Sequence, residues 1–201
     1  MSLIDIPPSS FIPDSILRLD YEAFYKVNEQ WHNSFFDTVL PFIREPSIWI
    51  PFYFFMLLFG LINFKLRGVY WVVFFIITAM LSDYISSSII KENFTRLRPC
   101  REPFLVDQVR FLVSYCPRSS SFTSSHAVNH FAISMYIFTT FKKSLSPKWA
   151  LMFLWAFAIS YAQVYVGVHF PLDVICGALV GLIIGYIPAK VFNTKIGLLQ
   201  H

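Results

Sequence analysis

Long apolar stretches alternate with short polar ones along most of the chain, and their lengths predict membrane-spanning helices. A helix needs about 20 apolar residues to cross the hydrocarbon core of a bilayer. Five stretches are close to this length: 47–64, 68–90, 125–141, 149–168 and 170–192. Helices are expected because a backbone in hydrocarbon must satisfy its own hydrogen bonds. The fourth and fifth stretches are nearly contiguous, so they predict a tight helical hairpin.

The N-terminal part of the chain has a different pattern. Charged side chains such as Asp20 and Glu22 alternate with Leu, Phe, Tyr and Trp over residues 14–43. This segment is too polar to span a membrane, and it predicts one or two amphipathic helices that lie on the membrane surface. The predicted organisation is an N-terminal interfacial segment (1–46), a membrane domain (47–192) and a C-terminal tail (193–201).

The composition strengthens the prediction of an all-α membrane bundle. Of the 201 residues, 56% are hydrophobic and only 14% are charged, against about 25% charged in an average soluble protein. A soluble domain of this size cannot bury so much apolar surface. The net charge of +4 does not indicate nucleic-acid binding, because the basic residues are scattered between apolar stretches instead of gathered on one polar surface.

The distribution of basic residues predicts the orientation of the spans. One side of the predicted membrane domain carries seven basic residues and no acidic one: Lys65, Arg67, Lys142, Lys143, Lys148, Lys190 and Lys195. The positive-inside rule places this side and the C-terminus in the cytoplasm. The long loop 91–124 then faces outward. Cys100 and Cys116 both lie in this loop, where oxidising conditions permit a disulfide; we favour a bridge over two unrelated thiols.

Polar and ionisable side chains gather at the outward ends of four predicted spans. They are Asp83, Lys91, Ser124, His126, Gln163, His169 and Asp173. Such groups are costly in a membrane and therefore indicate a functional site. An up-and-down topology brings all four ends to the same face, beside the basic loop. We expect these groups to converge on one pocket.

The predicted pocket has two features that favour an oxyanion such as phosphate. Lys91, Arg96, Arg98 and Arg101 place four cations within eleven residues, and cations of this kind bind phosphate. The Ser- and Thr-rich run before His126 predicts a helix N-cap, where free N–H groups and the helix dipole attract anions. Anchoring to anionic lipid headgroups is the alternative for the cations, but this loop faces away from the cytoplasmic leaflet.

His169 and Asp173 are four residues apart, so on a helix they share one face. A carboxylate in this position fixes the tautomer of an imidazole and stabilises its cationic form, as in nucleophilic and acid–base sites. A structural ion pair is the alternative. A metal site would have to draw on these two residues with Asp83, His126 and His130, but no spacing among them matches a compact ligand motif. We therefore expect no metal and no cofactor, and expect His130 to pack in the helix bundle.

At these positions the sequence resembles the type 2 phosphatidic acid phosphatases, membrane lipid phosphatases related to vanadium haloperoxidases. The first family motif, Lys-x6-Arg-Pro, is matched by Lys91, Arg98 and Pro99. The second, Pro-Ser-Gly-His, is matched loosely by residues 123–126. The third, Ser-Arg-x5-His-x3-Asp, is matched in part by residues 162–173. The helical layout extends the resemblance over most of the chain.

The resemblance implies a metal-independent double displacement. His169 is then the nucleophile that forms a phosphohistidine, and Asp173 orients it. His126 protonates the leaving oxygen and afterwards acts as the base for water. The groups implied to hold the phosphoryl oxygens are Lys91, Arg98, Ser124 and the backbone N–H groups near Ser125.

The third motif departs from the family at Gln163, which stands where the family has an arginine that binds phosphate. A neutral amide lacks the charge and the fork of a guanidinium, and losing a charge-assisted hydrogen bond costs about 1.5 to 3 kcal/mol. Arg96, Arg101 and Arg118 are candidates to compensate from the loop. Ser125 replaces a family glycine. These departures permit either an active enzyme with a shifted preference or a weakened one; we favour activity, because the nucleophile, its partner, the acid and two cations remain.

The leading hypothesis is a lipid phosphatase that acts on a membrane-embedded substrate at the outer face. The short, loop-poor chain resembles bacterial members that act on undecaprenyl pyrophosphate, which implies an inner-membrane protein whose site faces the periplasm. Phosphatidylglycerol phosphate, phosphatidic acid and lipid A phosphates are alternative substrates. A phosphotransferase and a weakly active lipid binder or transporter are alternative functions. The sequence leaves the oligomeric state open.

Overall fold

The computed structural model describes residues 11–105, 107–142 and 145–198. Within these ranges the regular elements are all helical, as predicted, and no strand occurs. The longer helices are α1 (Asp14–Tyr25), α2 (Ser34–Ile43), α3 (Ile50–Tyr84), α5 (Ser125–Phe141), α6 (Met152–Tyr165) and α7 (Pro171–Lys195). Short helical turns join them: Lys26–Gln30, Pro46–Trp49, Ile85–Ile90, α4 (Lys91–Asn93), Pro99–Arg101 and Pro147–Leu151. Lys143 of the predicted cytoplasmic group and the last three residues of the predicted tail lie outside the described residues.

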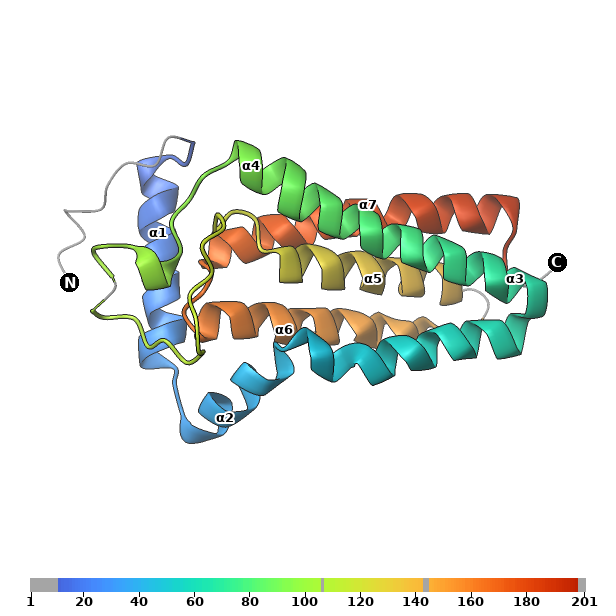
Figure 1. Ribbon diagram of the computed structural model, residues 1–201, viewed down its shortest axis with the longest axis horizontal. Helices are drawn as coiled ribbons and strands as arrows, with labels where there is room; N and C mark the ends of the chain where they lie inside the picture. The colour runs from blue at the N-terminus through green and yellow to red at the C-terminus, as the bar shows by residue number, and fades with distance from the viewer. Residues whose placement is uncertain (1–10, 106, 143–144, 199–201) are drawn as a thin grey trace.

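Helix α3 folds back on itself (Figure 1). Lys65 has backbone angles of φ 50° and ψ −127°, which are not helical, so the chain reverses there and the two arms run side by side. The arms meet at Gly60 and Gly68, where a Cβ on Gly68 would collide with the Gly60 carbonyl. The reversal falls between the predicted spans 47–64 and 68–90.

Two helical stretches are long and apolar enough to cross a membrane. One is 46–93, which contains both arms of α3, and the other is α7. Helices α5 and α6 lie at the predicted spans 125–141 and 149–168, but they do not pass the same test of length and hydropathy. The prediction of five spanning helices is therefore confirmed only in part.

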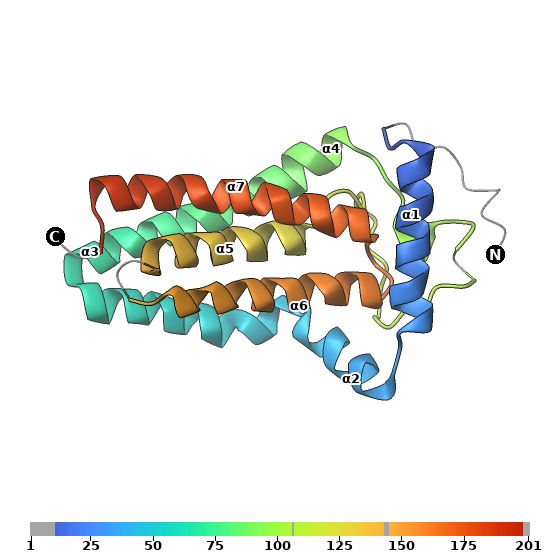
Figure 2. The same ribbon diagram turned by 180° about the vertical axis from the view of Figure 1, so that it is seen from behind.

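Helix α5 lies in the middle of the bundle, between α7 and α6 (Figures 1 and 2). Gly177, Gly181 and Gly185 of α7 face α5, and a Cβ on any of them would crowd a backbone carbonyl of α5 or of its cap. This stripe therefore serves close helix packing within the chain. The predicted tight hairpin of α6 and α7 is wrong in one respect: a short turn joins them, but α7 packs chiefly on α5, because its glycines leave room for that helix.

Aromatic rings fill the end of the bundle where α3 reverses. The Trp71 ring stacks on Phe141, with ring centroids 5.0 Å apart. The Trp71 indole N–H donates to Thr140 Oγ1 at 2.9 Å, and the Tyr136 hydroxyl donates to the Trp71 carbonyl at 2.8 Å. These side chains are buried, and the polar atoms of the large rings thus have partners inside the core.

Helix α1 runs across the opposite end of the bundle (Figure 2). It buries Leu17, Asp20, Tyr21 and Phe24, and the Tyr21 and Phe170 rings stack with centroids 4.8 Å apart. Helices are thus present where the amphipathic pattern predicts them, in α1 and α2. Their location on the membrane surface stays a prediction.

Candidate active site

The end of the bundle beneath α1 gathers the loop 94–124, the start of α5 and the turn between α6 and α7 (Figure 1). The predicted disulfide between Cys100 and Cys116 is confirmed, with Cα atoms 6.2 Å apart. It ties together two parts of the loop that lie near the site, and such a cross-link restricts the unfolded chain.

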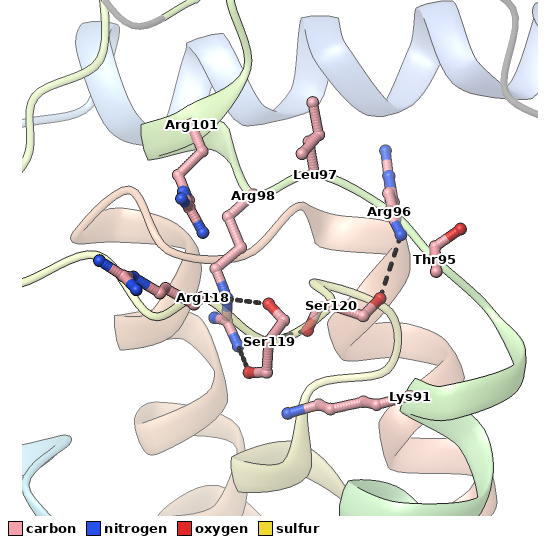
Figure 3. A pocket seen from close by; sticks show the side chains of 9 residues that line it. All are labelled: Lys91, Thr95, Arg96, Leu97, Arg98, Arg101, Arg118, Ser119 and Ser120. Carbon is pink, nitrogen blue, oxygen red and sulfur yellow. Dashed lines mark hydrogen bonds between the residues drawn. The ribbon is translucent and has the colours of Figure 1, made fainter.

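Arg98 is buried beneath this loop and is held by several acceptors. Its Nε donates to the Ser119 carbonyl at 3.0 Å and its Nη2 donates to Ser119 Oγ at 3.1 Å (Figure 3). Its Nη1 donates to the Val168 carbonyl at 3.0 Å and lies 2.9 Å from Nε2 of His169. Burial lowers the pKa of Arg98 to about 10, so the guanidinium stays charged at neutral pH.

The contact with Arg98 defines the tautomer of His169. A guanidinium only donates hydrogen bonds, so Nε2 of His169 accepts and the ring proton resides on Nδ1. Nδ1 lies 3.6 Å from Asp173 Oδ2 and 3.4 Å from Ser121 Oγ. Burial and the positive charge of Arg98 lower the pKa of His169 to about 3. The ring is therefore neutral at physiological pH, with a lone pair on Nε2.

Asp173 is fully buried at the start of α7 and has four hydrogen-bond or ionic partners. Besides His169, its Oδ2 accepts from the Phe170 backbone N–H at 3.0 Å and from the Ser121 hydroxyl. Its Oδ1 accepts from Nη1 of Arg96 at 2.7 Å. These donors fix the carboxylate, which in turn orients the imidazole.

Arg96 does not serve the role that the sequence predicted for it. Its guanidinium bridges Asp173 and Asp20, with Nη2 2.5 Å from Asp20 Oδ2, and lies 4.1 Å from the centre of the Phe170 ring. Asp20 also accepts from the Leu172 backbone N–H at 2.7 Å. Both terminal nitrogens of this guanidinium are thus bound to carboxylates. Arg96 therefore orients Asp173 and is not free to bind phosphate. Sequence reasoning missed Asp20, because no local signal separates it from the other charges of α1.

The predicted N-cap of α5 is confirmed at Ser124. Its Oγ accepts from the Ala127 backbone N–H at 3.4 Å, and its own N–H donates to the Asp173 carbonyl at 3.1 Å. Ser125 Oγ contacts Ser87 Oγ at 3.1 Å. Nε2 of His126 is buried and has no hydrogen-bond partner among the described residues. His130 packs in the bundle as predicted, with Nδ1 2.7 Å from the His126 carbonyl.

The predicted residues do not line one common cavity. Ser124, Gln163, His169 and Asp173 are buried and line neither of two cavities at this end of the bundle. The lining of the first, of about 390 Å³, includes Lys91, Arg96, Arg98, Arg101, Arg118 and Ser119, with Lys91 and Arg101 extending toward Arg98 (Figure 3). The second, of about 430 Å³, lies between α3 and α5 and includes Tyr53, Asp83, Ser125, His126 and Asn129. The prediction of one pocket is therefore wrong for His126 and for Asp83, whose Oδ1 accepts from Asn129 Nδ2 at 3.1 Å.

Gln163 is fully buried near the end of α6, and an arginine from another helix meets it. Nε of Arg44, the residue that ends α2, donates to Oε1 of Gln163 at 3.3 Å. Nε2 of Gln163 has no partner among the described residues. Arg101 and Arg118, predicted to compensate for the missing family arginine, are both exposed. Sequence reasoning did not single out Arg44.

Comparisons with known proteins agree with this geometry. The family model described as the PAP2 superfamily matches residues 70–196. A lipid A 4'-phosphatase of Bacteroides thetaiotaomicron is 30% identical over 154 residues, which cover 75% of this chain and 67% of the relative. An undecaprenyl-diphosphatase of Sulfolobus acidocaldarius is 31% identical over 147 residues, which cover 73% of this chain and 65% of the relative. The chain thus spans about two thirds of the length of these relatives.

A solved structure gives the same result for the fold. The crystal structure of Aquifex aeolicus LpxE superposes with a TM-score of 0.64 at 29% sequence identity. The match covers 92% of this chain and 99% of that one. The arrangement of the helices is therefore shared over nearly the whole length of both chains.

Proposed function

Since the chain belongs to the PAP2 superfamily and is a membrane lipid phosphatase of that family, we propose that it transfers the phosphoryl group of its substrate to Nε2 of His169 and then to water. One observation carries this proposal. The unprotonated Nε2 lies 2.9 Å from Nη1 of Arg98, a residue that lines the basic cavity, while Nδ1 faces Asp173. A nucleophile and a cation for the phosphoryl oxygens are thus adjacent.

In the first step Nε2 of His169 attacks phosphorus, and the bond from phosphorus to the lipid oxygen breaks. Nη1 of Arg98 must then exchange its contact with Nε2 for one with a phosphoryl oxygen, which frees the lone pair for attack. The imidazole becomes positively charged on phosphorylation, and the Asp173 carboxylate behind Nδ1 balances that charge. Lys91, which lines the first cavity, and N–H groups at the N-terminus of α5 near Ser125 hold the remaining oxygens. Ser124 caps this helix, and its own N–H stays bound to the Asp173 carbonyl.

We assign the proton transfers to His126. In its protonated form it gives the Nε2 proton to the leaving oxygen, and in the second step it takes a proton from the water that attacks phosphorus and releases His169. Its buried, unpartnered Nε2 supports this role, because a committed hydrogen bond there would have to break first.

The lining of the second cavity indicates which lipid could be the leaving group and therefore which substrate fits. It lies beside His126, and it contains the Asp83 carboxylate and a buried Asn129 Oδ1 that no described residue hydrogen-bonds. Hydroxyl and amide donors of a sugar headgroup would satisfy these acceptors. A leaving group that is itself a phosphate, as from undecaprenyl pyrophosphate, would be repelled by Asp83. We therefore propose a phosphorylated glycolipid of the lipid A type as the substrate, and undecaprenyl pyrophosphate, favoured by the sequence, as the second candidate.

We also propose that the chain crosses the membrane five times, with the site facing outside and the C-terminus in the cytoplasm. Lys65 and Arg67 at the reversal of α3 lie at the opposite end of the bundle from the site (Figure 1), which supports this orientation under the positive-inside rule. The test introduces one cysteine at position 65 and treats cells with a thiol reagent that does not cross membranes. We expect this cysteine to react only after the cells are opened. Reaction in intact cells would reverse the orientation.

The function is tested by phosphate release from purified protein in detergent. The panel contains lipid A, undecaprenyl pyrophosphate, phosphatidylglycerol phosphate and phosphatidic acid, with His169→Ala as the blank. We expect release from lipid A first, unchanged by EDTA, and an acid-labile phosphoenzyme that His169→Ala lacks. Release only when a second lipid or sugar is supplied would identify a phosphotransferase, and activity that EDTA abolishes and a divalent ion restores would exclude the metal-free mechanism.

A further inference from the structure

Arg44 is a buried cation whose charge is poorly balanced. The residue is 7% exposed, yet its carboxylate partner is Glu45, whose side chain is 52% exposed and lies 3.4 Å from Nη1. Its hydrogen bonds in the described part of the chain are made by Nε and Nη1, and Nη2, which is not fully enclosed, is open to a further acceptor. Buried charges in proteins are normally paired and fully hydrogen-bonded. An incompletely paired guanidinium beside an active site therefore has the capacity to bind an anion.

The surroundings of Arg44 add to this imbalance. The positive charge of Arg44 lowers the pKa of Arg98, so the two guanidinium groups are close enough to repel each other. Arg44 also lies within electrostatic range of His126. The buried carboxylates Asp20 and Asp173 do not pair with Arg44, because both are bound to Arg96. A dianion between Arg44 and Arg98 would remove the repulsion between them.

Gln163 links Arg44 to the nucleophile. Its side-chain Oε1 accepts from Nε of Arg44, while its backbone carbonyl accepts from the His169 N–H at 3.2 Å. The guanidinium of Arg44 therefore lies beyond the end of the Gln163 side chain, where a longer side chain on α6 would place its own head group. An arginine at position 163 would repel Arg44, whereas the glutamine amide offers it an acceptor and keeps a buried Nε2 donor free.

From this geometry we propose that Arg44 binds a phosphoryl oxygen of the substrate and that Gln163 is the residue that positions it. The cation that the third motif lacks is thus supplied by α2, from a segment far away in the sequence. The proposal rests on the proposed phosphatase function, since it names a further residue of the same phosphate site. The proposal also explains why the neutral amide of Gln163 is buried near His169, although the phosphorylated substrate of this nucleophile requires cations around it.

The test measures binding of inorganic phosphate and hydrolysis separately. We expect Arg44→Ala to weaken phosphate binding and to lower kcat/KM by about 10- to 100-fold, the loss of one charge-assisted hydrogen bond. Arg44→Lys should recover part of the loss, since it keeps the charge but not the Nε donor. Arg18→Ala, which removes an exposed arginine of α1, is the matched control and should match the wild type.

The double variant separates a phosphate ligand from a residue that only stabilises the fold. In the Arg44→Ala background, Gln163→Arg should restore phosphate binding and most of the activity, whereas Gln163→Arg alone should lower both through repulsion of Arg44. An Arg44→Ala protein that binds phosphate like the wild type would overturn the proposal. So would a loss of binding with a lowered unfolding temperature and no recovery in the double variant.

Failure of this proposal is distinguishable from failure of the proposed function. Phosphate binding is measured by the shift in unfolding temperature with added inorganic phosphate, and it requires no turnover. If the wild type hydrolyses no lipid but Arg44→Ala still weakens phosphate binding, the anion site stands and the phosphatase proposal falls. If the wild type hydrolyses lipid and Arg44→Ala retains full activity and binding, only the assignment of Arg44 falls.

Discussion

The two ends of the helix bundle are held together by opposite kinds of interaction. Where α3 reverses, Trp71, Tyr136 and Phe141 pack as a buried aromatic core. At the other end, Arg96 and Arg98 join the loop and α1 to the turn before α7 through buried ionic and hydrogen bonds. Burial of aromatic rings lowers the free energy of the folded state. For a buried ion pair, the attraction between the charges is largely offset by the cost of removing them from water.

This difference indicates which end of the bundle has been selected for catalysis and which for stability. A buried charged network is weak support for a fold, so its presence near α1 indicates that function requires it. Within the described residues, the aromatic end buries no charge, so it has no comparable desolvation cost and contributes to the stability of the fold. Substitutions at the site end should therefore reduce activity beyond their effect on stability, and substitutions at the aromatic end should do the reverse.

The largest expected effect is that of His169→Ala. Removing the attacking nitrogen should lower kcat by more than about 1,000-fold, because it removes the lone pair that forms the bond to phosphorus. The unfolding temperature should change little relative to this loss. Phosphate release under saturating lipid measures it, with the exposed His32→Ala as a control that keeps full activity. Residual turnover close to the wild type would assign the nucleophile elsewhere.

Arg96→Ala should damage both properties at once. It leaves Asp20 and Asp173 buried without their common cation, which costs about 3 to 5 kcal/mol of unfolding free energy. Because Asp173 then loses a donor that fixes it, kcat should fall as well. Chemical denaturation in detergent and phosphate release measure the two effects.

A matched pair on the same structure sharpens this prediction. Arg110 pairs with Asp37 at 2.8 Å, but their side chains are 20% and 31% exposed. Arg110 also donates to the Asn28 carbonyl at 3.0 Å, but the pair is partly exposed, so Arg110→Ala should cost less than Arg96→Ala, with about 1 kcal/mol from the ion pair. Equal losses in the two alanine variants would contradict the view that burial makes the network at the site special.

Phe141→Ala tests the aromatic end. The ring is fully buried against Trp71 and Trp149, so its removal should lower the unfolding free energy by about 3 kcal/mol. The folded fraction should keep the wild-type kcat, since no site residue contacts this ring. Thermal unfolding and activity per folded molecule are the measurements. A large fall in kcat at full folding would mean that the two ends are coupled.

Much of the fold follows from local sequence signals. Helix α5 spans the predicted residues 125–141, because Ser124 caps an apolar run that ends before a basic turn. The reversal near Lys65 coincides with the polar gap between two apolar stretches. The spacing of His169 and Asp173 predicts that their side chains meet, which they do, but for a different reason: His169 lies in the turn before α7 and not on the helix itself.

The rest of the site depends on contacts between residues far apart in the sequence, which no local sequence pattern predicts. Asp20 meets the Leu172 N–H across 152 positions, and Arg44 meets Gln163 across 119. In the sequence, Asp20 is one of several charges in an amphipathic helix and does not differ in kind from Glu22. Arg44 follows an apolar helix like any interfacial basic residue. Only the packing of α1 and α2 against the bundle selects these two side chains.

The smallest expected effect is a change in the pH profile at the site end. The pKa of His169 is lowered to about 3 by burial first and by the charge of Arg98 second. The wild type should therefore show no loss of kcat/KM from protonation of His169 between pH 5 and 8, because its ring is neutral well above its pKa. Arg98→Gln removes that charge and raises the pKa, so protonation should begin to lower kcat/KM at a higher pH. The position of this acidic limb is independent of the overall activity lost with the cation. An acidic limb at the same pH in both proteins would show that Arg98 does not control the charge of the nucleophile, and would reduce its role to binding the phosphoryl group.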